Sequence, residues 1–186
     1  MSYPSIKDAK FYPKIERRFK TYKVPRRKKS FSSICFPKKY ELQPPQKFLA
    51  KYIHPKTPYK GALVFHRIGS GKTCTAIRVG EEWKSTYKIM VVVPASLKGT
   101  FRSELRSLCA KNAYISARSR EKLETLDPAS DEYKDIIALS DAKIDKVYEI
   151  YSYNKFIDRA EEGTLTLKRR VLIIDEIQNM ISEHGK

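Results

Sequence analysis

The sequence contains few cysteines and histidines and has no long apolar run. The three cysteines, Cys35, Cys74 and Cys109, lie far apart in a chain of 186 residues, and the three histidines show no metal-ligand spacing. This pattern argues against a zinc ribbon or a disulfide scaffold and is typical of free thiols in a reducing, intracellular compartment. No run is long enough to span a bilayer, and the polar N-terminus lacks the apolar segment of a signal peptide. We therefore expect no membrane partner.

Acidic residues are also scarce, with 21 Asp and Glu against 38 Lys and Arg, for a net charge of +17. Residues 1–40 hold 13 of the basic residues and two of the acids, so a basic, irregular arm precedes a mildly basic domain of residues 41–186. Such a charge favours polyanions such as nucleic acid. Aromatic residues alternate with the cations of the arm, where they either stack on bases or dock the arm onto its own domain or a partner. A solvated tail and a localisation signal at residues 25–29 are the plainer alternatives.

Four apolar runs predict buried strands at residues 62–66, 88–93, 147–151 and 171–175, with helices between them. Continuous β-branched runs that alternate with helices are typical of an α/β fold with a parallel sheet and helices on both faces. In such sheets, ligands bind outside the carboxyl ends of the strands. We expect helices at residues 44–53 and 72–84, around 133–137, after a Ser152 cap, and after a Ser96 cap with Leu97, Phe101, Leu105 and Leu108 inward.

The turn after the first predicted strand reads HRIGSGKT and is typical of a phosphate-binding loop. Gly69 and Gly71 let the backbone turn tightly, so that N–H groups and the following helix N-terminus face phosphate oxygens. Lys72 then neutralises the outer phosphates, and the Thr73 hydroxyl is a ligand for Mg²⁺. His66 stands where the usual loop has its first glycine. The predicted cofactors are ATP and Mg²⁺, and the predicted nucleotide-binding residues of the loop are His66, Arg67, Ile68, Gly69, Ser70, Gly71, Lys72 and Thr73.

Two carboxylates, Asp175 and Glu176, follow the last predicted strand in VLIIDEIQ. A parallel sheet carries them to the same edge as Lys72, where Asp175 is expected to order Mg²⁺. Glu176 is then suited to orient and deprotonate the attacking water, so the predicted catalytic residues are Glu176 and Lys72. Two acids at an exposed strand end are the plainer alternative. The pairing with a phosphate loop 103 residues earlier favours the catalytic interpretation.

Four segments, HRIGSGKTCTAI, VVVPASLKGTFRSELR, IYSYNKF and IIDEIQNM, resemble in sequence and order the first motor domain of superfamily 2 helicases. They look most similar to DExH-type helicases of large DNA viruses, including the poxvirus-type early transcription factor ATPase subunit and nucleoside triphosphatase I. The resemblance covers residues 41–186 and implies an incomplete RecA-like fold of the P-loop NTPases. It also implies nucleic acid as a partner, DNA rather than RNA, transcription machinery, and a host cytoplasm or virion location.

The resemblance also assigns roles to residues outside the two phosphate-site motifs. Gln46 is similar to the glutamine that reads adenine, with an exposed helix start as the alternative. The segment 94–105 looks like one that touches the nucleic-acid backbone, and the alternative is an ordinary surface helix. For Tyr153 the alternative is core packing. The residues implied to contact nucleic acid are Ser96, Leu97, Lys98, Arg102, Tyr153 and Asn154.

Two functional hypotheses remain, and both bind nucleotide. The first is a motor that couples ATP hydrolysis to movement along nucleic acid, which the resemblance implies requires a second RecA-like domain that this chain lacks. The second is a binding module for nucleotide and nucleic acid without unwinding activity. A small-molecule kinase is disfavoured because the segments at 94–105 and 152–156 have no clear role in one. We expect residues 1–186 alone to bind Mg²⁺–ATP and to hydrolyse it very slowly, because the second domain supplies the arginines for catalysis.

Overall fold

The computed structural model describes residues 3–24, 40–65 and 69–181. The chain divides into two compact units, Met1–Glu82 and Trp83–Lys186, which are treated separately below. The domain boundary expected at residue 40 is not tested by this division and stays a prediction.

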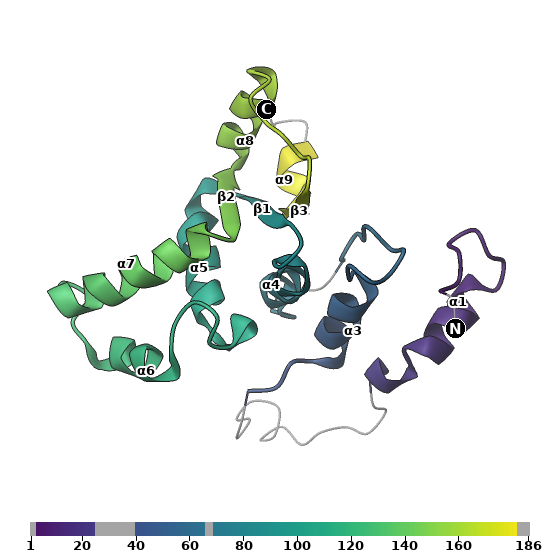
Figure 1. The fold of residues 1–186 in the computed structure, drawn as a ribbon, viewed down its shortest axis with the longest axis horizontal. Helices are drawn as coiled ribbons and strands as arrows, with labels where there is room; N and C mark the ends of the chain where they lie inside the picture. Colours follow the sequence, from purple (N-terminus) through teal and green to yellow (C-terminus); the bar gives the residue numbers. More distant parts are fainter. Residues whose placement is uncertain (1–2, 25–39, 66–68, 182–186) are drawn as a thin grey trace. The chain divides into compact units, whose positions relative to one another are not determined.

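The first unit is helical in its described residues. It contains α1 (Phe11–Arg18), the 3₁₀ helix η1 (Lys20–Tyr22), α3 (Pro44–Tyr52) and α4 (Lys72–Trp83), the last of which ends at the unit boundary (Figure 1). Part of the arm expected to be irregular is therefore a helix. The reason is the spacing of Phe11, Ile15 and Phe19, which places three apolar side chains on one helical face.

An aromatic core holds the described part of the arm against the rest of this unit. Ile15 and Phe19 of the arm and Ile53 and Tyr59 are buried, and further aromatic rings pack around them. The ring of Phe19 meets that of Phe48 edge to face at 5.2 Å between centroids. Docking onto the chain itself is therefore confirmed for Phe11, Phe19 and Tyr22, whereas Tyr12 is 82% exposed and its stacking on bases stays a prediction. Phe31 and Phe36 lie outside the described residues.

The buried strand predicted at residues 62–66 is wrong for residues 62–65, and His66 lies outside the described residues. These residues form no strand, and the side chains of Leu63 and Phe65 are 84% and 94% exposed. An apolar run becomes a buried strand only where neighbouring strands complete its hydrogen bonds. No described segment of the first unit offers it such an edge.

The second unit contains a parallel sheet of three strands in the order β2-β1-β3 (Figure 1). The strands are β1 (Lys88–Val93), β2 (Tyr148–Ser152) and β3 (Arg170–Ile174), each within one residue of its prediction. Val91 of β1 pairs with Ile150 and Ile173. Residues 89–93 of the central strand are at most 1% exposed, because neighbours and helices cover an apolar run. The predicted α/β class is confirmed, as part of a RecA-like sheet.

Helices flank this sheet. They are α5 (Lys98–Arg106), α6 (Ala117–Thr125), α7 (Asp131–Asp145), α8 (Tyr153–Glu161) and α9 (Gln178–Ile181), with 3₁₀ turns η2 (Ala95–Leu97) and η3 (Leu108–Ala110). Helices α5, α7 and α8 contact the strands. The short helix expected around residues 133–137 is thus the 15-residue α7, which has Ser130 as its N-cap.

The two predicted serine caps had opposite outcomes. Ser152 caps α8, and its hydroxyl accepts a hydrogen bond from the backbone N–H of Lys155 at 3.4 Å. Ser96 does not cap α5, because the turn after Pro94 continues as a 3₁₀ helix and moves the N-cap to Leu97. The same shift ends the inner face early. Phe101 and Leu105 are buried, whereas Leu108 falls in η3 and is 42% exposed.

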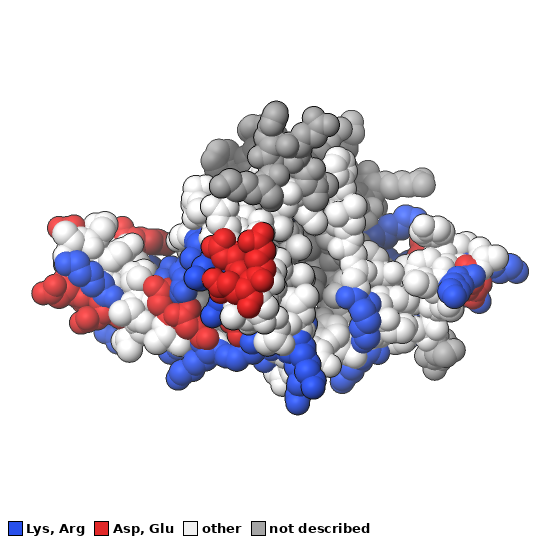
Figure 2. All heavy atoms as spheres, turned by 90° about the horizontal axis from the view of Figure 1, so that it is seen from above, with Lys and Arg blue, Asp and Glu red and all other residues white. Residues whose placement is uncertain are grey.

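Two remaining expectations concern the cysteines and membrane-spanning helices. The expectation of free thiols is wrong for Cys74 and Cys109, each of which is disulfide-bonded. Among the described helices, none has the length and apolarity that crossing a membrane requires. On the face that Figure 2 presents, the largest group of acidic side chains lies near the middle, and further acidic and basic side chains lie at several separate places.

Candidate functional site

The described part of the phosphate loop has the backbone that its glycines predict. Gly69 and Gly71 have φ angles of 77° and 78°, in the left-handed region that glycine adopts without strain. Helix α4 begins directly afterwards at Lys72, with Lys72 and Thr73 half-buried in its first turn. The carbonyl of Gly71 accepts hydrogen bonds from the backbone N–H and the hydroxyl of Thr75. His66, Arg67 and Ile68 lie outside the described residues.

Gln46 contacts this loop from helix α3. Its side chain is only 6% exposed, and its Nε2 donates a hydrogen bond to the carbonyl of Gly71 at 3.3 Å. Its Oε1 accepts a hydrogen bond from the backbone N–H of Gln43 at 2.8 Å, at the first turn of α3. A Cβ atom at Gly71 would lie 2.6 Å from Nε2 of Gln46. The glutamine is therefore not an exposed helix start, and its predicted contact with adenine stays a prediction.

The acid pair lies where β3 ends in the second unit. The backbone N–H of Asp175 donates to the carbonyl of Val92 at 3.0 Å, which continues the ladder between β3 and β1. The Oδ1 atom of Asp175 accepts from the backbone N–H of Glu176 at 3.1 Å. Glu176 has a φ of 54°, a left-handed conformation that is uncommon for a residue with a side chain. Both carboxylates are half-buried at the carboxyl end of the sheet.

Two side chains hold the turn that contains these acids. The Tyr153 hydroxyl lies within hydrogen-bond distance of the carbonyls of Asp175 and Glu176, the latter at 2.8 Å. Burial, followed by the charges of Asp175 and Glu176, raises the pKa of Tyr153, which keeps the hydroxyl protonated and able to donate. The side-chain amide of Gln178 donates a hydrogen bond to the Glu176 carboxylate. The structure therefore fixes both the backbone and the carboxylate of Glu176.

These contacts were not predicted from the sequence. Tyr153 was expected to contact nucleic acid, and its bonds go to carbonyl groups 22 and 23 residues later in the chain. The order of the strands explains the contact. Strand β1 lies between β2 and β3, so Tyr153, which directly follows β2, reaches across the end of β1. The sequence signals here were the resemblance of residues 152–156 to a segment that contacts nucleic acid, with Tyr153 and Asn154 as candidates, and Ser152 as a cap.

The remaining predicted nucleic-acid contacts lie on two helix starts. Ser96 is exposed in η2, Lys98 begins α5, and Asn154 is exposed in the first turn of α8. The backbone N–H of Leu97 already donates to the carbonyl of Pro94 at 2.9 Å. These residues are placed at the carboxyl ends of β1 and β2, as expected, and their contact with nucleic acid is not tested.

Arg102 has a structural partner instead of an open surface. Its guanidinium pairs with Asp141 at 3.0 Å and Asp145 at 2.5 Å on helix α7. Burial alone would lower the pKa of Arg102, but the hydrogen bonds that it donates to these two carboxylates outweigh burial and raise the pKa. Arg106 also pairs with Asp141. Arg102 therefore joins α5 to α7, and its role toward nucleic acid stays a prediction.

Oxygen donors suit Mg²⁺ at the predicted site. Magnesium is usually held by one or two protein oxygens together with phosphate oxygens and water, and it does not need a cage of side chains. The described residues contain no group of three or more His, Cys, Asp or Glu side chains that could hold a metal ion. Thr73 and Asp175 supply one oxygen ligand each in the prediction. Their meeting stays a prediction, because the loop and the acids belong to different units.

Comparison with known proteins finds relatives among viral helicases. Over 185 residues, all of this chain, it is 57% identical to a "Putative ATP-dependent RNA helicase" of Acanthamoeba polyphaga mimivirus. It is 27% identical over 158 residues to a "Putative helicase" of Invertebrate iridescent virus 3, and 25% identical over 147 residues to one of Frog virus 3. These matches cover 73% and 74% of this chain and 15% of each relative.

No family model and no solved structure matches the chain. The chain spans 32% of the length of the mimivirus relative. The expected similarity to helicases of large DNA viruses is therefore confirmed, while the superfamily 2 subgroup and the poxvirus-type relation stay predictions. The chain is similar along its whole length to about a third of a protein named an ATP-dependent helicase.

Proposed function

We propose that this chain is the ATP-binding part of a superfamily 2, DExH-type helicase that couples ATP hydrolysis to movement on nucleic acid. The observation that carries the proposal is the turn at Gly69 and Gly71, which leads directly into α4 with Lys72 and Thr73 in its first turn. Backbone N–H groups at such a turn and helix start bind phosphate oxygens. The acid pair after β3 adds the groups that hydrolysis requires.

Each side chain has a distinct task in this proposal. Lys72 holds the outer phosphates, while Thr73 and Asp175 hold Mg²⁺, which neutralises charge on the phosphates when bound. Glu176 accepts a proton from the attacking water at its carboxylate, which the amide of Gln178 keeps in one orientation. Tyr153 fixes the backbone of both acids. Gln46 supports Gly71 and, if its amide turns, can reach adenine.

The nucleic-acid contacts are proposed for the turns after β1 and β2. Ser96, Leu97, Lys98 and Asn154 lie there, at the carboxyl end of the same sheet as the acids. Tyr153 then links a turn that contacts nucleic acid to the turn that contains Glu176. DNA is the track predicted from the sequence, whereas the printed name of the mimivirus relative says RNA. Hydrolysis measured with each nucleic acid in turn decides between them.

Two substitutions test the nucleotide site. We expect Lys72→Ala to weaken Mg²⁺–ATP binding, and Glu176→Gln to leave binding intact while lowering single-turnover hydrolysis about 100-fold or more. Binding is measured with a fluorescent ATP analogue and hydrolysis by quenched single turnovers on the full chain. Equal affinity in Lys72→Ala and the parent would refute the proposal. Steady-state hydrolysis as fast as that of complete helicases would refute the expected need for a second domain.

A further inference from the structure

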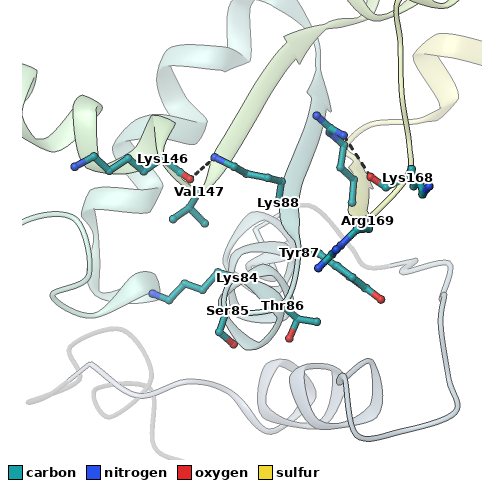
Figure 3. Close-up of a pocket in the computed structure, with 10 residues that line it drawn as sticks. Lys84, Ser85, Thr86, Tyr87, Lys88, Lys146, Val147, Lys168 and Arg169 are labelled. Carbon is teal, nitrogen blue, oxygen red and sulfur yellow. Dashed lines mark hydrogen bonds between the residues drawn. The ribbon is translucent and has the colours of Figure 1, made fainter.

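A second charged site lies at the opposite edge of the sheet from the acids. A cavity of about 340 Å³ opens where the three strands begin, lined by ten residues of the second unit (Figure 3). Strand β3 advances about 3.3 Å per residue, which places this edge roughly 16 Å from Asp175. Within the second unit, the cavity is therefore separate from the acid turn after β3 and from the turns after β1 and β2. Its basic residues are Lys84, Lys88, Lys146, Lys168, Arg169 and Arg170.

These cations are poorly compensated. None of the ten lining residues is acidic. Arg170 pairs with Glu149 through two contacts of 3.0 Å, and Lys88 donates to the carbonyl of Lys146. In the described part of the chain, Lys146, Lys168 and Arg169 form no ion pair. The like charges of neighbouring cations repel one another, so the arrangement favours an anionic ligand over an empty cavity.

One of these residues is also held in a strained backbone conformation. Arg169 has a φ of 56°, which residues with a side chain seldom adopt. Strained residues of this kind gather at binding sites, where surrounding structure holds them in place. In Figure 3 the Arg169 side chain turns toward Tyr87 and the Lys88 side chain reaches the Lys146 carbonyl, while the side chains of Lys84 and Lys146 extend outward on the side away from Arg169. Cations from three chain segments thus line one edge of the sheet.

The order of the strands sets the spacing of the positive charges. Lys146 precedes β2, Lys88 begins β1, and Arg169 precedes β3, in the spatial order β2-β1-β3. Adjacent strands lie about 4.8 Å apart, so this row spans about 10 Å. A nucleic-acid strand in a duplex carries one negative charge per 3.4 Å or so, which brings about three phosphates to a row of this length. The hydroxyls of Ser85 and Thr86 add donors on the same wall.

We infer that this edge of the sheet is a second nucleic-acid contact, which binds the phosphate backbone of a single strand through Lys146, Lys168 and Arg169. The inference rests on the proposed function for the choice of nucleic acid over other anions. It implies that the chain contacts nucleic acid at both edges of one sheet.

A pair of triple variants of the full chain tests this inference. The site variant combines Lys146→Gln, Lys168→Gln and Arg169→Gly, and the control combines Lys111→Gly, Arg118→Gln and Lys134→Gln on α6, α7 and the loop before α6. Both remove three exposed cations, and each replaces a residue of positive φ, 56° at Arg169 and 57° at Lys111, by glycine. Circular dichroism and thermal unfolding establish that both variants fold.

Fluorescence anisotropy then follows binding of labelled oligouridylate and oligothymidylate across a range of salt concentrations. The site variant should lower the slope of log affinity against log salt by about 2, because each lost contact to a single strand removes about 0.7. The control should lower it by less than one contact. Equal changes in the two variants, or an unchanged slope in the site variant, would overturn the inference.

Two further titrations identify a different ligand. Tripolyphosphate or polyglutamate that binds the parent and the control but not the site variant, with oligonucleotide slopes unchanged, would assign the cavity to that anion and overturn the inference. Fluorescent ATP binding by Lys72→Ala separates the two proposals. If Lys72→Ala loses ATP binding and the site variant keeps the oligonucleotide slope of the parent, only the second contact is refuted. If Lys72→Ala keeps ATP binding and the site variant lowers the slope, only the nucleotide site is refuted.

Discussion

The phosphate loop and the turn after β3 both use left-handed backbone, and they obtain it in opposite ways. The loop has glycine at φ 77° and 78°, whereas the acid turn places Glu176 at φ 54°. Glycine avoids the steric cost but offers only backbone groups to a ligand. The proposed role of Glu176 needs a carboxylate; the Tyr153 hydroxyl donates to its backbone carbonyl, and the Gln178 amide donates to its carboxylate. The chemistry expected of each turn therefore decides whether glycine or supporting side chains solve the conformational problem.

The largest effect should follow from a substitution at Gly71 of the phosphate loop. Gly71→Ala adds about 1–2 kcal/mol of left-handed strain, and the new Cβ displaces the Gln46 amide and its two hydrogen bonds. We expect a total loss of about 3 kcal/mol in the free energy of unfolding, with a marked loss of ATP binding. Chemical denaturation and titration with a fluorescent ATP analogue measure the two effects.

A double-mutant cycle isolates the role of Gln46 in this loss. In a Gln46→Ala background, Gly71→Ala should cost only the strain, about 1–2 kcal/mol. If the cost is the same in both backgrounds, the contact between Gln46 and Gly71 does not explain the glycine.

An intermediate effect is expected when the support of the acid turn is removed. Tyr153→Phe deletes one hydroxyl and leaves the carbonyls of Asp175 and Glu176 without that donor, at a cost of about 1–2 kcal/mol. Because Tyr153 holds the turn of Glu176, the proposed catalytic base, we expect slower single-turnover hydrolysis at unchanged ATP affinity. A purely structural role would lower stability and leave the hydrolysis rate of the folded fraction unchanged. Lys155→Ala, at an exposed position two residues later on α8, is the control for hydrolysis.

Alkaline pH provides a second test of the same hydroxyl. The pKa of Tyr153 is raised above its ordinary value of 10.0, so its contribution to stability is complete below pH 10 and is lost as pH rises through the raised pKa. Tyr153→Phe should therefore show a smaller loss of stability above pH 10 than the parent. Tyr52 and Tyr59, whose pKa values are also raised, keep some of the loss in both proteins.

The smallest effect is expected at Gly69. Its φ of 77° nearly equals that of Gly71, but a Cβ atom there has no neighbour within 4 Å among the described residues. Gly69→Ala should cost about 1–2 kcal/mol of strain without displacing any side chain. Comparison with Gly71→Ala by chemical denaturation thus separates strain from steric displacement. A loss at Gly69 as large as that at Gly71 would contradict this explanation.

Much of the second unit follows from local pattern. The strands β1, β2 and β3 are continuous apolar runs beside turn residues, and Ser152 caps a helix because its hydroxyl needs only the next turn of backbone. Residues 62–65 carry the same kind of pattern and form no strand, because a strand also needs an edge to pair with. Ser96 failed as a cap because the 3₁₀ turn after Pro94 shifted the helix start by one residue.

The residues of the candidate site also differ in whether the local sequence predicts their contacts. The glycines of the phosphate loop and the acids after β3 were predicted because each motif consists of neighbouring residues in the sequence. The contacts of Tyr153, Gln46 and Arg102 were missed because each joins segments more than 20 residues apart through backbone groups or a helix pair. The basic cavity was not predicted for a related reason. Its cations lie at the starts of three strands, and only the order of the strands in the sheet brings them together.

The aromatic core of the first unit changes how the basic arm has to be studied. Removal of residues 1–40 looks like a simple way to remove charge, but it also removes Ile15 and Phe19 from a packed core and the Pro4 carbonyl from the Tyr59 hydroxyl. Weaker nucleic-acid binding after such a truncation would mix electrostatics with damage to the unit that contains the phosphate loop. Replacement of exposed cations such as Lys20 and Lys23 by glutamine, with every ring kept, measures the charge of the arm by itself.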